Sequence, residues 1–331
     1  MSKKIDRKLT SVALLILMII IFSINKPLFF SVGNFSSILR DAASVGIISC
    51  GATFVIITGG IDNSVGSMMA LSAMVCANML KFYQLPLILV LLITLVLSTL
   101  MGGVNGVLVA KLKIPDFIVT LATMNIYRGL TRALNRTDVE SLQHPMIENE
   151  TFGNFGGKVG NIYYVTILML VMIFIAYYIL KHTKMGLYTY AVGSNAKSAA
   201  LTGISFKKIK IFAYTLTGFC CGIAGIMSAS RMMTATTETG SGMEFSVISA
   251  IVIGGCSLQG GRGDMIGTLI GTLLMAVINS GITQLGVSTY YQSIIKGVVI
   301  LAAVLLDIAY ASLAEKKLKQ ERNKELAKEA A

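Results

Sequence analysis

Two glycine-rich breaks interrupt apolar stretches of this sequence and place polar groups where a solute could bind. Residues 55–66 read VIITGGIDNSVG and residues 251–267 read IVIGGCSLQGGRGDMIG, so each break separates two apolar runs. Broken helices in matching positions often line the route of a transporter, because their freed backbone groups bind the solute. A tight turn, in which glycine provides the bend, explains the same pattern. The residues that we predict nearest such a route are Gly59, Gly60, Asp62, Ser64 and Asn105.

Catalytic alternatives require residue sets that are incomplete in this sequence. Gly261-Arg262-Gly263-Asp264 has the G-x-G-D form of intramembrane aspartyl proteases, whose chemistry needs a second carboxylate, here Asp62 or Asp307. The sequence contains no P-loop, no H-E-x-x-H and no G-x-S-x-G motif. Its five cysteines lack metal-ligand spacing and its two histidines are isolated. We therefore predict that this chain has no catalytic residue and binds no metal ion or cofactor.

The composition indicates a membrane protein with many spans. Of the 331 residues, 54% are hydrophobic and only 13% are charged, and the mean hydropathy is +0.75. Soluble domains carry about 25% charged residues, and a helix needs about 20 apolar residues to cross a bilayer. We predict an all-α integral membrane fold of about ten helices, some of them broken. The expected spans are 10–25, 42–58, 64–80, 86–109, 117–134, 162–180, 210–231, 244–258, 265–284 and 291–310.

Positive charges predict the orientation of these spans. The formal net charge is +12. Lys and Arg gather at the ends of apolar runs, as the positive-inside rule expects, and not on a basic face with interleaved aromatics, which argues against nucleic acid binding. We predict that both termini and residues 181–210 are cytoplasmic, and that the acidic loop 135–161 is external. Lys296 and Asp307 are further charges in the last apolar run.

The basic interruption at residues 181–210 contains helix signals of its own. Ser194 or Asn195 can cap the alanine-rich run 196–201, and Gly203 can end it. A short helix held outside the membrane between two spans is suited to contact another protein. A basic loop that only fixes the orientation of the spans would have the same composition, so both interpretations stay open at this point.

Four segments together resemble the permease subunits of bacterial ATP-binding-cassette (ABC) importers of ribose, galactose and xylose. The segments are residues 58–66, 105–130, 190–204 and 253–263, and their order and spacing match over nearly the whole chain. Two positions depart from the usual pattern. Asn63 stands where such permeases usually have Leu between Asp and Ser, and Asp116 stands where a small residue or proline usually follows Ile-Pro.

The resemblance implies the permease fold of vitamin B12-type importers and a path for sugar, without an ATPase site in this chain. It assigns residues 1–310 to a transmembrane permease domain, in which 181–210 is a cytoplasmic coupling loop, and residues 311–331 to a cytoplasmic charged tail. In such permeases the coupling loop docks in a cleft of the ATPase subunit. The residues that match this element are Gly193, Asn195, Ala199, Ala200 and Gly203.

The same resemblance implies partners and a location. The partners are ABC ATPase subunits, which bind the ATP, a periplasmic or lipid-anchored sugar-binding protein, a second permease copy as a homodimer or a paralogue, and membrane lipid. The location is the bacterial inner membrane. The alternatives are an ion-coupled secondary transporter that uses Asp62 or Lys296, the intramembrane protease, and a purely structural subunit, which the broken helices argue against.

Overall fold

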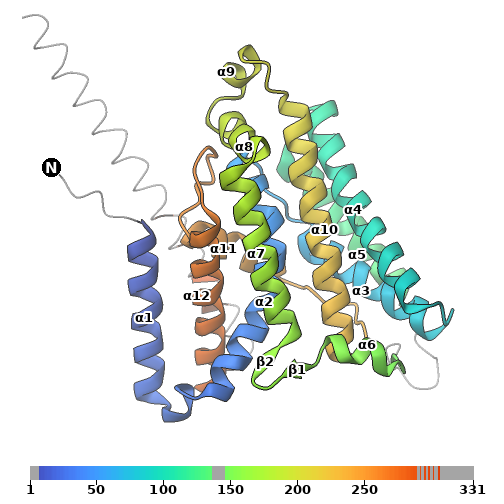
Figure 1. Cartoon of the computed structure of the whole chain (residues 1–331), viewed down its shortest axis with the longest axis vertical. Coiled ribbons are helices and arrows are strands. Elements are labelled where there is room, and N and C mark those ends of the chain that lie inside the picture. Colours follow the sequence, from blue (N-terminus) through green and yellow to red (C-terminus); the bar gives the residue numbers. More distant parts are fainter. Residues whose placement is uncertain are drawn as a thin grey trace, which may run out of the picture.

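Within the part of the chain that the structure describes, almost every segment is helical (Figure 1). The computed structural model describes residues 7–135 and 146–288, together with scattered positions between 291 and 305. Lys296, Asp307 and the tail 311–331 lie outside the described residues. The helices are α1 (Arg7–Asn25), η1 (Pro27–Phe29, a 3₁₀ turn), α2 (Val32–Ile57), α3 (Val65–Lys81), α4 (Leu87–Leu112), α5 (Asp116–Ala133), α6 (Glu150–Phe155), α7 (Tyr164–His182), α8 (Lys184–Ser194), α9 (Ala196–Leu201), α10 (Phe206–Met232), α11 (Met243–Ile253) and α12 (Met265–Gln284).

A helix lies over each expected apolar segment as far as residue 284, so the helical, multi-span character of the chain is confirmed. The largest difference is at α2, which begins at Val32 and not near residue 42. Its start is set by Ser31, whose side chain accepts a hydrogen bond from the Asn34 amide, an N-cap that satisfies one of the orphan donors of the first turn. A short hairpin of two-residue strands, β1 (Lys158–Val159) and β2 (Ile162–Tyr163), joins the end of the predicted outer loop to the start of the next expected span.

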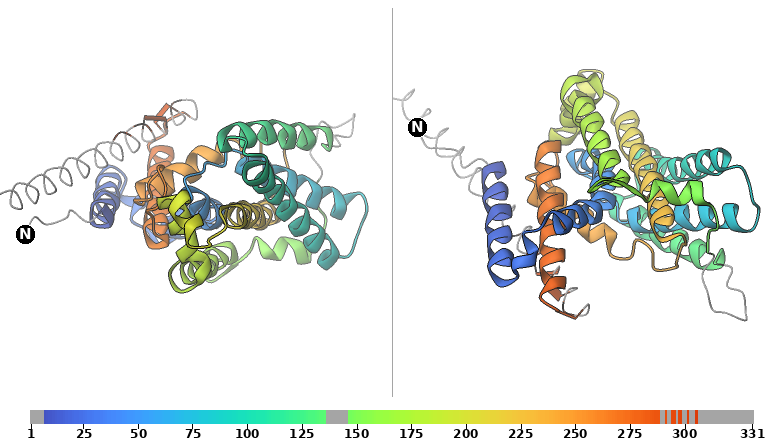
Figure 2. Two further views of the ribbon diagram at one scale, coloured as in Figure 1. Left: turned by 90° about the horizontal axis from the view of Figure 1, so that it is seen from above. Right: turned by 60° about the horizontal axis from the view of Figure 1, so that its bottom comes forward.

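The two ends of the helical bundle carry different connecting segments. The α9 end holds α8, α9 and the breaks after α2 and α11, whereas the hairpin end holds β1, β2 and α6 (Figure 1). Figure 2 shows α1 at one edge of the molecule and α3, α4 and α5 at the opposite edge. Helix α2 is the central element, since it packs against α7, α10, α11 and α12, while α10 also packs against α3 and α4.

The outer surface of the bundle is apolar in the way that lipid contact requires. Five of the described helices, α2, α4, α7, α10 and α12, are long and apolar enough to cross a membrane. Only 28% of the apolar window of α4 is buried inside the chain, against 78% for α2. An apolar surface of this extent would be unstable in water, so we infer that α4 and the similarly exposed α7 face lipid or another membrane subunit.

Helices α4 and α10 approach so closely that their backbones touch. A Cβ atom added at Gly102 would lie 2.8 Å from the backbone of Gly218, and one added at Gly218 would lie 2.9 Å from the backbone of Gly102. The Ser98 hydroxyl also donates a 2.5 Å hydrogen bond to the Gly218 carbonyl across this contact. Small residues permit such packing in membranes, where dispersion and interhelical hydrogen bonds hold helices together.

Adjacent glycines of α4 provide a matched test of this packing. We expect Gly102→Ala to destabilise the protein by about 1–3 kcal/mol, because the added methyl group overfills the interface. Gly103→Ala should leave stability nearly unchanged, since its Cβ would meet only the Thr215 hydroxyl at 3.5 Å. Thermal unfolding in detergent can be followed with a thiol-reactive fluorophore, because all five cysteines are buried. Equal stability of the two variants would show that the α4–α10 contact is not close-packed.

Candidate functional site

The two sequence breaks form the same turn at the same helix position. After α2, the Gly59 amide donates to the Ile56 carbonyl at 2.9 Å and the Gly60 amide to the Val55 carbonyl at 3.0 Å. After α11, the Gly255 and Cys256 amides make the equivalent bonds to Val252 and Ile251, at 2.9 and 3.1 Å. Both pairs define a Schellman motif, in which a glycine with positive φ ends a helix; φ is +74° at Gly59 and +95° at Gly255. The resemblance of residues 55–60 and 251–256 is therefore structural as well as sequential.

The last helical carbonyl before each break accepts a hydrogen bond from a residue that is distant in the sequence or belongs to another helix. The Ile57 carbonyl of α2 accepts a 2.8 Å hydrogen bond from the Gly261 amide, which belongs to the second break. The Ile253 carbonyl of α11 accepts a 2.6 Å bond from the Ser11 hydroxyl of α1. Helix-end carbonyls need such partners when they are buried. The first of these bonds joins the two breaks directly.

Gly193, near the end of α8, packs into the place where the two breaks meet. A Cβ atom added there would collide with the Ile57 carbonyl oxygen and lie 2.6 Å from the Gly261 amide nitrogen. A Cβ added at Gly260 would in turn lie 2.9 Å from both the Gly193 carbonyl oxygen and the Gly59 amide nitrogen. We call this contact of Gly59, Gly193, Gly260 and Gly261 the glycine junction. It places the predicted coupling loop in backbone contact with both breaks.

A phenol strengthens the attachment of α8 to the second break. The Tyr190 hydroxyl of α8 donates a 2.7 Å hydrogen bond to the Gly263 carbonyl. Burial raises the pKa of Tyr190 to about 12, so the hydroxyl stays protonated and able to donate. Together with Gly193, this bond fixes the position of α8 against the turn that precedes α12.

The segment after α8 has the predicted capped helix. Of the five predicted coupling residues, Asn195 caps this helix and the other four fall into two groups. The Asn195 side chain accepts from the Lys197 and Ser198 amides, so Asn195 and not Ser194 is the N-cap of α9. Gly203 follows the helix with φ of +80°. Ala199 is buried against Val192 and Ile209, whereas Ala200 and Gly203 are exposed. Gly193 and Ala199 therefore support the loop from within, while Ala200 and Gly203 lie where a partner can reach them.

Three of the predicted path residues form a buried polar chain beside the first break. The Asn105 amide of α4 donates to the Ser64 hydroxyl at 2.8 Å, and that hydroxyl donates to Asp62 Oδ1 at 2.6 Å. These three residues are 0–4% exposed. In the described part of the chain, the second acceptor oxygens, Asp62 Oδ2 and Asn105 Oδ1, have no hydrogen-bond partner. A buried acceptor without a donor is unfavourable. The Asp62–Ser64–Asn105 network is therefore suited to accept a hydrogen bond from a donor such as a hydroxyl group.

Gly60 brings the first break against an ion pair that the sequence did not predict. The Lys210 ammonium lies 2.5 Å from Asp116 Oδ2, and the Tyr214 hydroxyl donates to the same oxygen at 3.0 Å. A Cβ added at Gly60 would collide with Asp116 Oδ2 and lie 2.7 Å from Lys210 Nζ. Lys210 is only 3% exposed and Asp116 is 21% exposed. The pair therefore ties the start of α5 to the start of α10 directly beside Gly60.

Two further charged residues in or beside the described apolar helices, Arg128 and Asp264, have separate partners. The Arg128 guanidinium donates to the Thr237 and Thr239 carbonyls at 2.7 and 2.8 Å and so anchors the loop before α11. Asp264 caps α12 by accepting from the Ile266 amide. Of the two carboxylates that the protease hypothesis named as partners of Asp264, Asp62 is bonded to Ser64, and Asp307 lies outside the described residues. Among the described residues, no three His, Cys, Asp or Glu side chains gather as metal ligands would.

Comparisons with known proteins agree with the geometry of a transport subunit. Residues 34–304 match the family described as branched-chain amino acid transport system / permease component. The ribose import permease protein RbsC of Haemophilus influenzae is 42% identical over 298 residues, which is 89% of this chain and 91% of that protein. RbsC of Bacillus subtilis is 40% identical over 294 residues, 88% of this chain and 90% of that protein. The fructose import permease protein FrcC of Rhizobium meliloti is 33% identical over 283 residues, 84% of this chain and 79% of that protein. No solved structure matches this chain significantly.

The buried Asp116–Lys210 ion pair should contribute far more to stability than an exposed ion pair with a similar distance between its nitrogen and oxygen atoms. We expect Asp116→Ala to destabilise the protein by about 3–5 kcal/mol, because it leaves the Lys210 charge buried without compensation. Adding Lys210→Met should recover most of the loss. The matched control is Glu148→Gln, which removes the exposed 2.7 Å pair with Lys81 and should change stability by less than about 1 kcal/mol. Thermal unfolding of the three variants and the unmodified protein gives the comparison, and an Asp116→Ala effect no larger than the control would contradict the role of the pair.

Proposed function

This chain belongs to the permease family that residues 34–304 match, and we propose that it is the membrane-spanning subunit of an ATP-driven monosaccharide importer. It forms the path for the sugar, while ATP is bound and hydrolysed by separate subunits. The observation that carries the proposal is the glycine junction, which places the α8–α9 segment in direct contact with both helix breaks. A movement imposed on α8 from outside must therefore displace the residues that line the path.

The relatives and the site chemistry both favour a sugar over an amino acid. The family description names branched-chain amino acids, but the curated relatives are named for ribose, fructose and allose. The polar chain of Asp62, Ser64 and Asn105 offers one carboxylate, one hydroxyl and one amide. An amino acid would require partners for a carboxylate and an ammonium together, whereas a neutral polyol is bound well by hydroxyl and amide groups.

The chain is one component of a larger transporter. Its relatives are named as import permeases, which work with an ATPase and a binding protein in ABC systems. The proposed partners of this chain are an ABC ATPase, a periplasmic or lipid-anchored sugar-binding protein and a second permease copy, either identical or a paralogue. The two apolar faces of α4 and α7 are available to lipid and to that second copy.

The proposed topology places the α9 end in the cytoplasm and the hairpin end outside the inner membrane. The α9 end carries Lys184, Lys197, Lys207 and Lys208, as the positive-inside rule requires of a cytoplasmic loop. Ten spans, with both termini cytoplasmic and the architecture of the vitamin B12-importer permeases, complete this proposal. Residues 1–310 are then the permease domain and 311–331 the charged cytoplasmic tail.

We propose that the ATPase binds the exposed side of α9 and of the turn that follows it. Leu201 at the end of α9 is 91% exposed, a high value for a large apolar side chain in a segment outside the bilayer. Ala200 and Gly203 flank it on the exposed surface. ATP-driven closure of the ATPases would move α9, and α8 would transmit the movement through Gly193 and Tyr190 to the breaks. The path then alternates between two states whose populations the ATPases bias.

Reconstitution tests the proposed function. We expect proteoliposomes that contain this chain, its ATPase and its binding protein to accumulate radiolabelled ribose, fructose or allose only when ATP is supplied. Liposomes with this chain alone should show no uptake under a proton gradient. Uptake by the chain alone would instead support the ion-coupled transporter, in which the buried Asp62 carries the proton.

Leu201 provides a test of coupling that leaves the path untouched. We expect Leu201→Asp to reduce sugar-stimulated ATP hydrolysis by about tenfold or more, since burial of a leucine side chain contributes about 1.5–3 kcal/mol to a contact. Leu112→Asp, at the end of α4, is the matched control, because that leucine is 63% exposed at the same end of the molecule. Equal hydrolysis rates for Leu201→Asp and the unmodified complex would show that α9 is not the docking element.

A further inference from the structure

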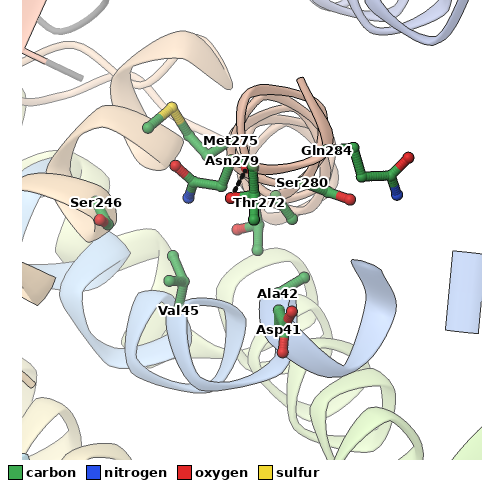
Figure 3. Close-up of a pocket in the computed structure, with 11 residues that line it drawn as sticks. Asp41, Ala42, Val45, Ser246, Thr272, Met275, Asn279, Ser280 and Gln284 are labelled. Carbon is green, nitrogen blue, oxygen red and sulfur yellow. Dashed lines mark hydrogen bonds between the residues drawn. The ribbon is translucent and has the colours of Figure 1, made fainter. Parts of the chain in front are cut away.

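A pocket with a cavity volume of about 260 Å³ lies between α2, α11 and α12, towards the hairpin end. Figure 3 shows Thr272, Asn279 and Ser280 of α12 above Ala42 and Val45 of α2, with Ser246 of α11 to one side. Pockets for drug-sized ligands measure about 300–1,000 Å³, so this one fits a smaller molecule. Seven of the eleven residues that line it are polar, although two of its three helices, α2 and α12, are long and apolar enough to cross a membrane. The polar residues include Asp41, Ser246, Thr272, Asn279, Ser280 and Gln284.

The polar side of this pocket is one face of α12. Thr272, Asn279, Ser280, Thr283 and Gln284 are separated by the intervals that bring residues to one side of a helix. A stripe of hydroxyl and amide groups is costly against lipid, so it must face water or protein. The pocket therefore explains why an otherwise apolar helix carries a stripe of polar residues on one face.

Asn279 has the hydrogen-bonding capacity that a ligand would use. The Ser280 hydroxyl and the Gln284 amide both donate to Asn34 Oδ1 of α2, at 3.2 and 2.6 Å. Asn279 Oδ1 is buried and has no hydrogen-bond partner in the described part of the chain. In Figure 3 the Asn279 amide projects from α12 towards the space between Val45 and Ser246. The neighbours are thus fixed in place while Asn279 retains an acceptor for a bound hydroxyl.

Threonine residues form a hydrogen-bonded row that leads from this pocket towards the glycine junction. Thr272 donates to the Thr268 carbonyl at 2.8 Å, and the Thr268 hydroxyl lies 3.1 Å from the Thr53 hydroxyl of α2. Cys256, in the second break, lies 3.7 Å from the same Thr268 oxygen. These threonines are no more than 1% exposed, so the route is closed between the pocket and the break.

We propose that the pocket between α2, α11 and α12 is the site that receives the monosaccharide on the hairpin side of the membrane, an assignment that rests on the proposed function. Its amides and hydroxyls bind a neutral polyol, and the Thr53–Thr268 contact closes the path beneath the bound sugar. Movement of the glycine junction separates α2 from α12 at this contact and opens the route onward. The carboxylate of the pocket, Asp41, is paired with both Arg40 and Arg231, so it is not free to bind the ammonium group of an amino acid.

Protection of an introduced thiol tests the site directly. In the reconstituted complex, Asn279→Cys should react with a membrane-impermeant methanethiosulfonate, and the native cysteines should not, because all five are buried. We expect saturating ribose, fructose or allose to slow this reaction at least threefold and leucine to leave it unchanged. The control is Asn161→Cys in the exposed β1–β2 turn, whose reaction rate should not respond to sugar.

Transport kinetics provide the second measurement. Thr272→Val keeps the shape of the side chain and Asn279→Leu removes the amide, and each should raise the sugar concentration for half-maximal uptake by about tenfold. Asn125→Leu is the matched control, since Asn125 is exposed on α5 and bonds only to the Leu121 carbonyl of its own helix.

The outcomes separate this assignment from the proposed function. If the unmodified complex accumulates sugar but sugar does not protect Asn279→Cys, the pocket is not the receiving site and the proposed function stands. Protection by leucine and not by sugar would overturn the assignment to monosaccharides. If the complete complex accumulates no sugar, the proposed function fails and this assignment fails with it.

Discussion

The hydrogen bond from the Gly261 amide to the Ile57 carbonyl is the constraint on which the arrangement of the α9 end depends. It satisfies a carbonyl at the end of α2 that would otherwise be buried without a donor, and it does so with the backbone of the second break. Gly193 then lies against the same carbonyl, because any side chain there would push the two breaks apart. Three segments that are distant in sequence are thereby held together by close backbone contacts, which leave little room for one to move without the others.

The two breaks are equivalent as turns but are attached to different parts of the chain. The first is held through Gly60 to the Asp116–Lys210 pair, and Lys210 belongs to the first turn and a half of α10, directly after the segment that contains α9. The second is held to α8 by Tyr190 and to α1 by Ser11. Under the proposed mechanism, a displacement of the α8–α9 segment would reach the second break through α8, and the first break through both Gly193 of α8 and Lys210 of α10.

The sequence predicts local features of this site well and its long-range contacts poorly. Apolar runs of sufficient length locate the helices, and the sequence predicts the extent of α9 and limits its cap to Ser194 or Asn195, because both features are set by neighbouring residues. The two Gly-Gly breaks are recognisable for the same reason. The pairing of Asp116 with Lys210 joins residues 94 positions apart, and nothing in the local pattern of either residue indicates the other. Ala199 and Ala200 look alike in sequence, and only the packing against Val192 and Ile209 shows which of them faces inward. The polar stripe of α12, in contrast, has helical spacing and could have been read from the sequence.

A buried ion pair is well suited to the end of a membrane path that must open and close. Apolar contacts resist separation, because opening them exposes apolar surface to water at about 25 cal/mol per Å². Asp116 and Lys210 are desolvated in the closed arrangement, so an opening that admits water recovers part of their hydration free energy and offsets the lost attraction between them. The hydrogen bonds of the glycine junction have a similar property, since each contributes only about 0.5–1.5 kcal/mol net when water can replace the lost partner. These interactions are thus specific in geometry but small in net free energy. Under the proposed mechanism, an ATPase bound at α9 would need to supply only a modest free-energy difference to shift the equilibrium.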